Sequence, residues 1–206
     1  QGALLQDGGK HGRFVRIVRI DIASGSTEQF AYPLENLGTD EKPHYSGISD
    51  TLAINGHALL VLERDGKGRG DGSDAAFKRI YRVDLRGAKT LGKRQGQPAL
   101  ASVAMAKHLF ADIVALAGER GMAPSSIPVK LEGLSFGPDI VRADERQHTL
   151  LVSSDNDFLA QLPNPGSTPV DNPNEIFVLS MTPKDLGGYI PQRMVRHCQR
   201  LSAAKP

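Results

Sequence analysis

Hydrophobic and β-branched residues in the middle of the chain fall into three short runs, at residues 46–54, 57–63 and 77–85. The first two runs are separated by Asn55-Gly56, a dipeptide typical of tight hairpin turns. A loop rich in Gly and Asp separates the second run from the third. Runs of this length and composition, bounded by turn residues, indicate strands. The pattern therefore predicts a meander of antiparallel strands with polar residues at the strand ends.

The same order of runs returns between residues 131 and 181. Gly47 lies 86 residues before Gly133, and Leu59 lies 91 residues before Leu150. A repeat longer than the ~40–50 residues of one propeller blade still fits a β-propeller if the first copy carries an insertion. Residues 86–129 have the place of that insertion.

Two further strands are predicted near the start of the chain. Residues 13–22 alternate basic with apolar side chains, and residues 27–32 return after the turn Ser24-Gly25-Ser26. We interpret residues 13–32 as half a blade whose other strands precede this chain.

The remaining elements complete a prediction for the whole chain. A strand over residues 99–110 would close a full blade at 45–112, a short helix follows at 113–121, and residues 130–201 form a further blade with an outer strand near 194–201. The predicted fold is all-β, about two and a half blades of a larger propeller. Since such rings use ~4–8 blades, we expect a missing N-terminal half, as another chain or fragment.

The charge balance excludes some classes of function. The chain has 25 basic and 23 acidic residues, spread along its length, so no basic stripe indicates nucleic-acid binding. No apolar run reaches the ~18–20 residues of a membrane span. The single cysteine, Cys198, is either a free thiol or a bridge to the missing half.

Five motifs occur in the order of one known family: YSGISD (45–50), LVLERD (60–65), KRIYRVDL (78–85), KLEGLSFGP (130–138) and LVSSDN (151–156). Over about residues 13–181 the chain resembles the C-terminal half of the phytase-like domain, also called esterase-like activity of phytase. The resemblance implies one such domain over residues 1–206, a bacterial β-propeller that is periplasmic or secreted. It also implies a phosphoester or ester hydrolase activity on a small-molecule substrate.

Acidic and amide side chains follow corresponding strands of the two copies. In a propeller these strand ends converge on one channel, and Ca²⁺ takes ~6–8 oxygen ligands. The alternative is that the same residues only cap turns. We predict calcium ligands at Asp50, Glu132, Asp155 and Asn156, and catalytic acids at Glu63, Asp65 and Glu132.

Three basic residues are candidates for binding an anionic substrate: Arg64, Arg79 and His44. An arginine beside carboxylates can hold a phosphate through two parallel hydrogen bonds. Arg79 also fits an ion-pair network within the fold, and His44 also fits an ordinary turn residue. Both interpretations stay open at this point.

Two hypotheses of function follow. The first is a calcium-assisted hydrolase of phosphate or other esters. The second is a non-catalytic propeller that binds a protein or glycan, which the lack of a compact catalytic motif favours. Residues 133–137 match the pattern G-x-S-x-G, which surrounds the serine nucleophile of many hydrolases. That site needs a helix after the serine, whereas a strand is expected here, so the pattern does not favour the hydrolase.

Overall fold

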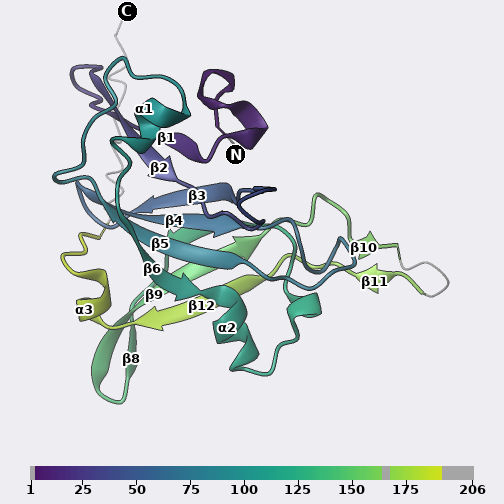
Figure 1. The fold of residues 1–206 in the computed structure, drawn as a ribbon. Helices are drawn as coiled ribbons and strands as arrows, with labels where there is room; N and C mark the ends of the chain where they lie inside the picture. The colour runs from purple at the N-terminus through teal and green to yellow at the C-terminus, as the bar shows by residue number, and fades with distance from the viewer. Residues whose placement is uncertain (1–2, 164–167, 192–206) are drawn as a thin grey trace, which may run out of the picture.

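Short antiparallel sheets dominate the computed structural model, which describes residues 3–163 and 168–191 (Figure 1). The strands are β1 (Phe14–Ile20), β2 (Thr27–Pro33), β3 (Gly47–Ala53), β4 (Ala58–Arg64), β5 (Lys78–Asp84), β6 (Lys107–Asp112), β7 (Leu131–Phe136), β8 (Ile140–Arg142), β9 (Glu145–Ser154), β10 (Gln161–Leu162), β11 (Val170–Asp171) and β12 (Ile176–Met181). The α-helices are α1 (Gln97–Ala101), α2 (Ile113–Gly118) and α3 (Pro183–Leu186), and the 3₁₀-helices are η1 (Leu5–Asp7), η2 (Gly9–His11) and η3 (Pro124–Ser126). None of these helices is long and apolar enough to cross a membrane.

The strands form three larger sheets and one small hairpin. β1 pairs with β2, the second sheet has the order β3-β4-β5-β6, and the third has the order β7-β9-β12, with β8 also paired to β9. β10 and β11 form the hairpin that projects at one end of the molecule (Figure 1). The structure is thus mostly β-sheet, as predicted, with a few short helices. Within the described residues the sheets do not close into a barrel or ring, so the propeller stays a prediction.

The three central apolar runs form β3, β4 and β5 within one or two residues of their predicted bounds. The strand predicted over residues 99–110 is wrong in its first half. Pro98 lies in the first turn of α1, where proline is tolerated, and the strand begins only at Lys107. Residues 86–129 are thus more than an insertion, because they supply the fourth strand of the second sheet. The predicted strand near 194–201 and Cys198 lie outside the described residues.

A β-bulge occurs at the same place in the first strand of each copy. In β3, Ile48 pairs with Glu63 and Asp50 with Leu62, which leaves Ser49 as the extra residue. In β7, Leu131 pairs with Ser154 and Gly133 with Ser153, which leaves Glu132 as the extra residue. The pairing matches Ser49 with Glu132 and corrects the sequence alignment, which matched Gly47 with Gly133.

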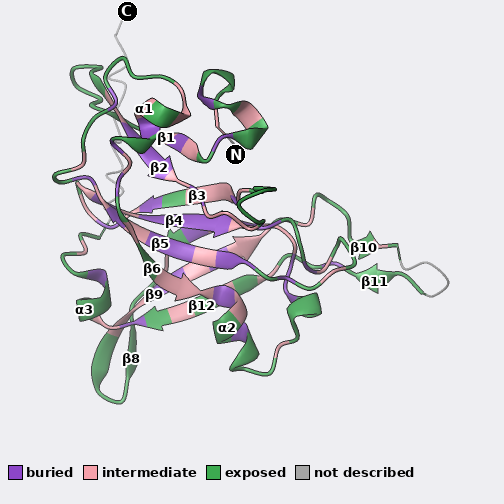
Figure 2. Ribbon diagram, viewed as in Figure 1, coloured by how far each residue is buried: buried purple, intermediate pink, exposed green. Residues whose placement is uncertain are grey.

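The second sheet is buried on both faces, and β4 and β5 hold much of its buried surface (Figure 2). Each fully buried aliphatic side chain stabilises the fold by about 1.5–3 kcal/mol relative to an exposed one. One face packs on the third sheet and α2 through Leu60, Leu62, Ile80, Ile113, Leu134, Leu150 and Val152. The other face packs on the first sheet through Val15, Tyr32, Leu34, Val61 and Val83. The three sheets therefore stack in chain order.

Candidate functional site

The first strands of the second and third sheets lie side by side and are joined by a polar contact. The backbone N–H of Leu134 in β7 donates to Oδ2 of Asp50 in β3 over 2.6 Å. The other carboxylate oxygen of Asp50 accepts from the N–H of Thr51 at 2.7 Å. Asp50 therefore fastens one sheet to the next.

Arg64, at the end of β4, contacts both bulge residues. Its Nε donates to Oγ of Ser49 over 2.8 Å, and its Nη2 donates to the carboxylate of Glu132. Nη1 contacts the backbone carbonyl of Asp65 at 3.3 Å. Bulges are frequent beside active sites because they re-aim a side chain, and here two of them direct side chains at one guanidinium.

We name Ser49, Asp50, Arg64 and Glu132 the inter-sheet cluster. The Arg64 side chain is 20% exposed and that of Glu132 is 35% exposed, so a dissolved molecule can reach both. Ser49 accepts from Arg64 through its oxygen, which leaves its O–H proton available to a ligand. The cluster thus offers a cation, a carboxylate and a hydroxyl at one partly exposed place.

Glu63 lies outside this cluster, in a buried network between the first and second sheets. Its side chain is fully buried and accepts from the hydroxyls of Tyr32 and Ser46 and from Nζ of Lys107, each at 2.5 Å. The backbone N–H of Glu35 adds a fourth bond at 3.2 Å. Every acceptor oxygen of Glu63 is therefore occupied by the protein itself.

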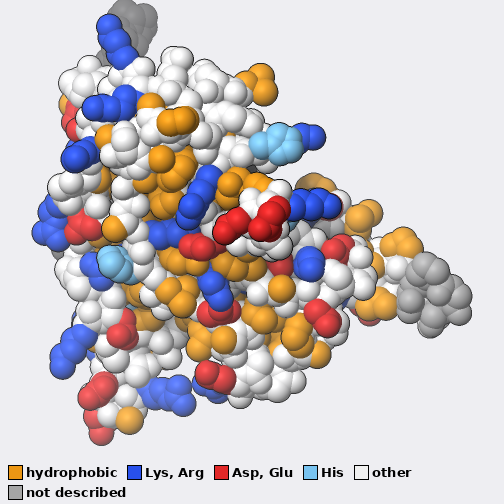
Figure 3. Space-filling model, viewed as in Figure 1, with side chains coloured by type: hydrophobic (Ala, Val, Ile, Leu, Met, Phe, Trp, Pro, Cys, Tyr) orange, Lys and Arg blue, Asp and Glu red, His pale blue; other side chains and the backbone are white. Residues whose placement is uncertain are grey.

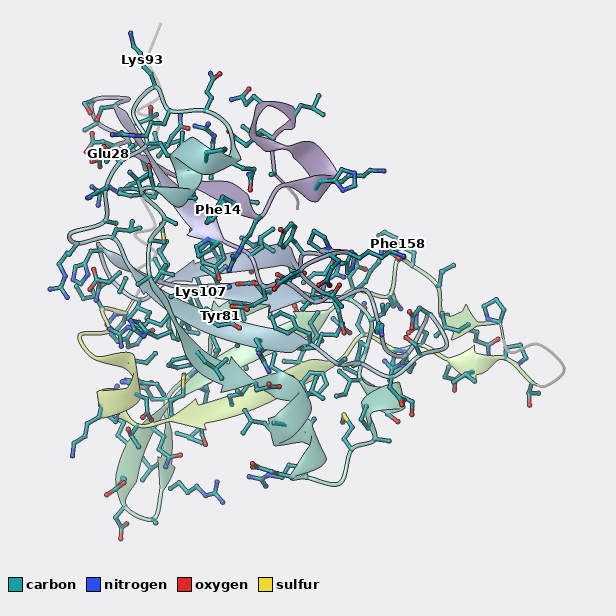
Figure 4. All side chains as sticks on the ribbon, in the orientation of Figure 1. Phe14, Glu28, Tyr81, Lys93, Lys107 and Phe158 are labelled. Atoms are coloured by element: carbon teal, nitrogen blue, oxygen red, sulfur yellow. The ribbon has the colours of Figure 1, made fainter. Side chains whose placement is uncertain are left out.

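Aromatic rings enclose the cation of this network. Nζ of Lys107 lies 4.1 Å from the ring centre of Tyr81 and 5.0 Å from that of Tyr32, and Figure 4 shows Lys107 beside Tyr81. Burial raises the pKa of Tyr81 to about 12. Burial, followed by the charge of Glu63, also raises the pKa of Tyr32. Both phenols thus stay neutral, which suits rings packed around a buried ion pair.

Asp65 forms a second buried ion pair, with Lys78 of β5. Its Oδ1 lies 2.6 Å from Nζ of Lys78, and its Oδ2 accepts from the backbone N–H groups of Ala76 and Phe77. Lys78 also donates to three backbone carbonyls, of which that of Val129 belongs to the segment leading to β7. Burial lowers the pKa of Lys78. The pair closes the base of the loop between β4 and β5.

The two other predicted anion-binding residues lie apart from the cluster. Nε of Arg79 donates to Asp112, its cross-strand neighbour on β6, over 2.8 Å, and this bond raises the pKa of Arg79. Its guanidinium also lies 4.9 Å from the ring centre of Phe77. His44 is exposed, and its backbone N–H donates to the side chain of Asn36. Arg79 thus takes part in an ion pair within the fold.

Asp155 and Asn156 follow β9 in a loop that they organise themselves. Oδ1 of Asp155 accepts from the N–H of Asp157, and the amide of Asn156 donates to the carbonyl of Asn172. A pocket of about 80 Å³ adjoins them. Across the described residues, no three His, Cys, Asp or Glu side chains are grouped so as to hold a metal ion. The predicted calcium ligands are thus not gathered into one carboxylate cluster among these residues, and calcium binding stays a prediction.

Four important polar residues were not selected from the sequence: Ser46, Ser49, Lys78 and Lys107. A lysine within an apolar run, such as Lys78 before Arg79-Ile80-Tyr81, is a signal that a buried carboxylate must face it. Lys107 gave no such signal, because it is followed by another polar residue, His108, in a strand of mixed composition. Ser49 depends on the bulge, which nothing in the local sequence indicates.

Comparison with known proteins adds one relationship. A family model described as "Phytase-like: Esterase-like activity of phytase" matches residues 1–158. No curated protein and no solved structure matches the chain. The matched residues include the inter-sheet cluster and the Glu63 network, whereas β12 lies beyond them.

Proposed function

Because that family model covers more than half of the chain, the chain belongs to the phytase-like family, and we propose that it hydrolyses phosphoesters or other esters at the inter-sheet cluster. The observation that supports this site is the meeting of Ser49, Arg64 and Glu132 at two matched bulges. The planar guanidinium of an arginine can bind a phosphate group through two parallel hydrogen bonds.

The cluster supplies three actions toward an ester. Arg64 binds the anionic oxygen atoms of the substrate, and the free O–H of Ser49 donates to one of them. A phosphoester displaces Glu132 from Arg64, because its phosphate group and the Glu132 carboxylate are anions that compete for the same guanidinium. The released carboxylate then accepts a proton from the water that attacks phosphorus, as a general base does. The bond from phosphorus to the leaving oxygen breaks, and the proton on Glu132 passes to that oxygen, so the products are phosphate and an alcohol.

The test compares steady-state hydrolysis of p-nitrophenyl phosphate, phytate and p-nitrophenyl butyrate. We expect Glu132→Gln to lower kcat by about 10²–10⁴-fold, the usual contribution of a general base. Arg64→Lys keeps the charge but loses the planar fork, so it should raise KM for the phosphate substrates. Arg19→Gln, which removes an exposed pair with Glu28, is the matched control. Equal rates in all four proteins would refute the site.

Calcium assistance remains a prediction, and no step above uses a metal ion. The described carboxylates that were predicted as ligands are engaged by Arg64 or by backbone N–H groups. Thermal unfolding of the protein with calcium and with EGTA tests the point, since a ligand bound only to the folded state raises Tm. An increase in Tm with calcium would support calcium binding, and an unchanged Tm would count against it.

We also propose that the stacked sheets belong to a β-propeller that a further half completes, in a periplasmic or secreted protein. Exposed apolar residues on the third sheet support this. Ile176 and Val178 of β12 are 62% and 63% exposed, and both point away from the second sheet, opposite to Phe177 and Leu179. Packing of a further sheet would bury them.

The second candidate function is a binding module without catalysis. Phe158 favours it, because this aromatic ring is fully exposed and lies in the loop after β9, at the end of the sheet (Figure 4). Exposed aromatic rings are typical anchors at binding surfaces. If a glycan array identifies a ligand that Phe158→Ala no longer binds, while Glu132→Gln leaves that binding unchanged, the protein is a binding module.

A further inference from the structure

A groove of about 600 Å³ lies between α2 and β12, on the side of the molecule away from the first sheet. Its volume falls within the ~300–1,000 Å³ typical of small-molecule sites. Figure 3 shows hydrophobic side chains gathered in the region of α2. The apolar lining comes from three elements and one loop, and consists of Ile113, Leu116, Ala117, Met122, Ile140, Phe177, Val178 and Leu179.

Charged side chains also line this groove. Arg120 follows α2 and Arg142 ends β8, and both line the groove together with Glu119. Neither arginine side chain has a hydrogen-bond or ion-pair partner within the described part of the chain, in contrast to Arg64 and Arg79. The groove therefore combines apolar walls with an excess of positive charge.

We infer that this groove binds a small amphipathic anion, an aliphatic chain that ends in a carboxylate or a phosphate. The chain would lie against Leu116, Phe177 and Leu179, and the anionic end would pair with Arg120 and Arg142. A neutral apolar ligand would leave both guanidinium groups without a counter-charge. A cationic ligand would be repelled by them.

A second copy of the chain is a less suitable occupant. β12 has β9 as its only strand partner among the described residues, so another strand could pair with its free edge. However, an identical chain would bring its own Arg120 and Arg142 to the interface or leave those of this groove unpaired. The charge of the rim thus favours a small anion.

The inference is independent of the proposed hydrolase site. The groove contains none of Ser49, Asp50, Arg64 and Glu132. Loss of activity in a cluster variant would therefore leave binding in the groove unchanged, and the two proposals can fail separately.

The experiment is titration calorimetry of the full chain with octanoate, decanoate and dodecanoate below their micellar concentrations. Decyl phosphate tests the second kind of head group, and 1-decanol is the neutral probe. We expect Kd to fall about fourfold for each added methylene, as burial of one CH₂ group predicts. Binding of decanoate should weaken as salt is raised, because partly exposed charges are screened.

Three variants of the rim separate charge from packing. Arg120→Gln and Arg142→Gln should each weaken decanoate binding by about two- to fivefold, the range of a partly exposed ion pair. Glu119→Gln removes a carboxylate from the lining of the groove and should strengthen decanoate binding. All three side chains are exposed, so the variants should fold like the original chain.

Several results would overturn the inference. These are the absence of binding, equal binding of decanoate and 1-decanol, and an affinity for decanoate that is the same in the three rim variants as in the original chain. Sedimentation velocity on the same samples adds one more. A concentration-dependent dimer that excludes decanoate would assign the groove to a second copy.

Discussion

Replacement of Glu63 by glutamine distinguishes a structural from a catalytic role for this residue. Glutamine keeps the shape of the side chain but presents one oxygen and one NH₂ group instead of two acceptor oxygens. One oxygen of Glu63 accepts from Tyr32 and Lys107, and the other accepts from Ser46 and the N–H of Glu35. In either orientation, the new NH₂ group therefore faces a donor that cannot accept a hydrogen bond, either Nζ of Lys107 or the N–H of Glu35.

The expected cost follows from burial. Glu63 is fully buried and the Lys107 side chain is 8% exposed. Among the described residues, Glu63→Gln therefore leaves the ammonium group with only Glu35 as a counter-charge, at 3.0 Å. Removal of one partner of a buried ion pair costs about 3–5 kcal/mol. For a chain of this size that corresponds to a fall in Tm of about 6–20 °C.

Urea unfolding followed by circular dichroism measures the loss, with hydrolase activity assayed on the folded fraction. Tyr32→Phe removes one bond to the carboxylate and should cost about 1.5–3 kcal/mol. Glu35→Gln should cost less than about 1 kcal/mol, because the Glu35 side chain is 37% exposed. Suppose that the free energy of unfolding of Glu63→Gln lies within about 1 kcal/mol of that of the original chain, while activity is lost. Glu63 would then act in the chemistry, and a structural role in the buried network would be wrong.

Three further outcomes can be measured by the same unfolding assay. Lys78→Met leaves the buried carboxylate of Asp65 without its cation and should cost about 3–5 kcal/mol, and a cost near zero would contradict a buried pair. Gly68→Ala should destabilise the fold by about 1–3 kcal/mol, because Gly68 has φ +129° and a Cβ there would lie 2.4 Å from the carbonyl oxygen of Ile127. Gly66→Ala is the control, because a Cβ at Gly66 would lie in open space. The fold favours the neutral phenol of Tyr81, whose pKa of about 12 lies above that of an unfolded tyrosine. This stabilisation is complete below about pH 10 and is lost as the pH rises toward 12. Tyr81→Phe should therefore lose less stability than the original chain between these pH values. Identical profiles of stability against pH in the two proteins would contradict the raised pKa of Tyr81.

Local patterns in the sequence were sufficient to predict the strands of the second sheet. The apolar runs that become β3, β4 and β5 are bounded by turn residues, and a strand buried on both faces needs apolar residues at consecutive positions. The family resemblance was carried by the same segments, and the family model confirms it. The strand predicted over residues 99–110 failed where Pro98 and the alanines after it favour a helical turn instead.

The roles of the acidic residues depended on tertiary structure. Glu63 and Asp65 lie two residues apart at the end of β4, yet Glu63 contacts Lys107, 44 positions away, and Asp65 contacts Lys78. Partners that distant are chosen by strand register and by which sheet packs on which, and neither is written in a short stretch of sequence.

The sequence by itself determined that this chain is a β protein of the phytase-like family, because strand pattern and motif order are local properties. Only the tertiary structure decided which polar side chains meet. Two bulges each add one residue to a strand, and that shift directs Ser49 and Glu132 toward the same guanidinium.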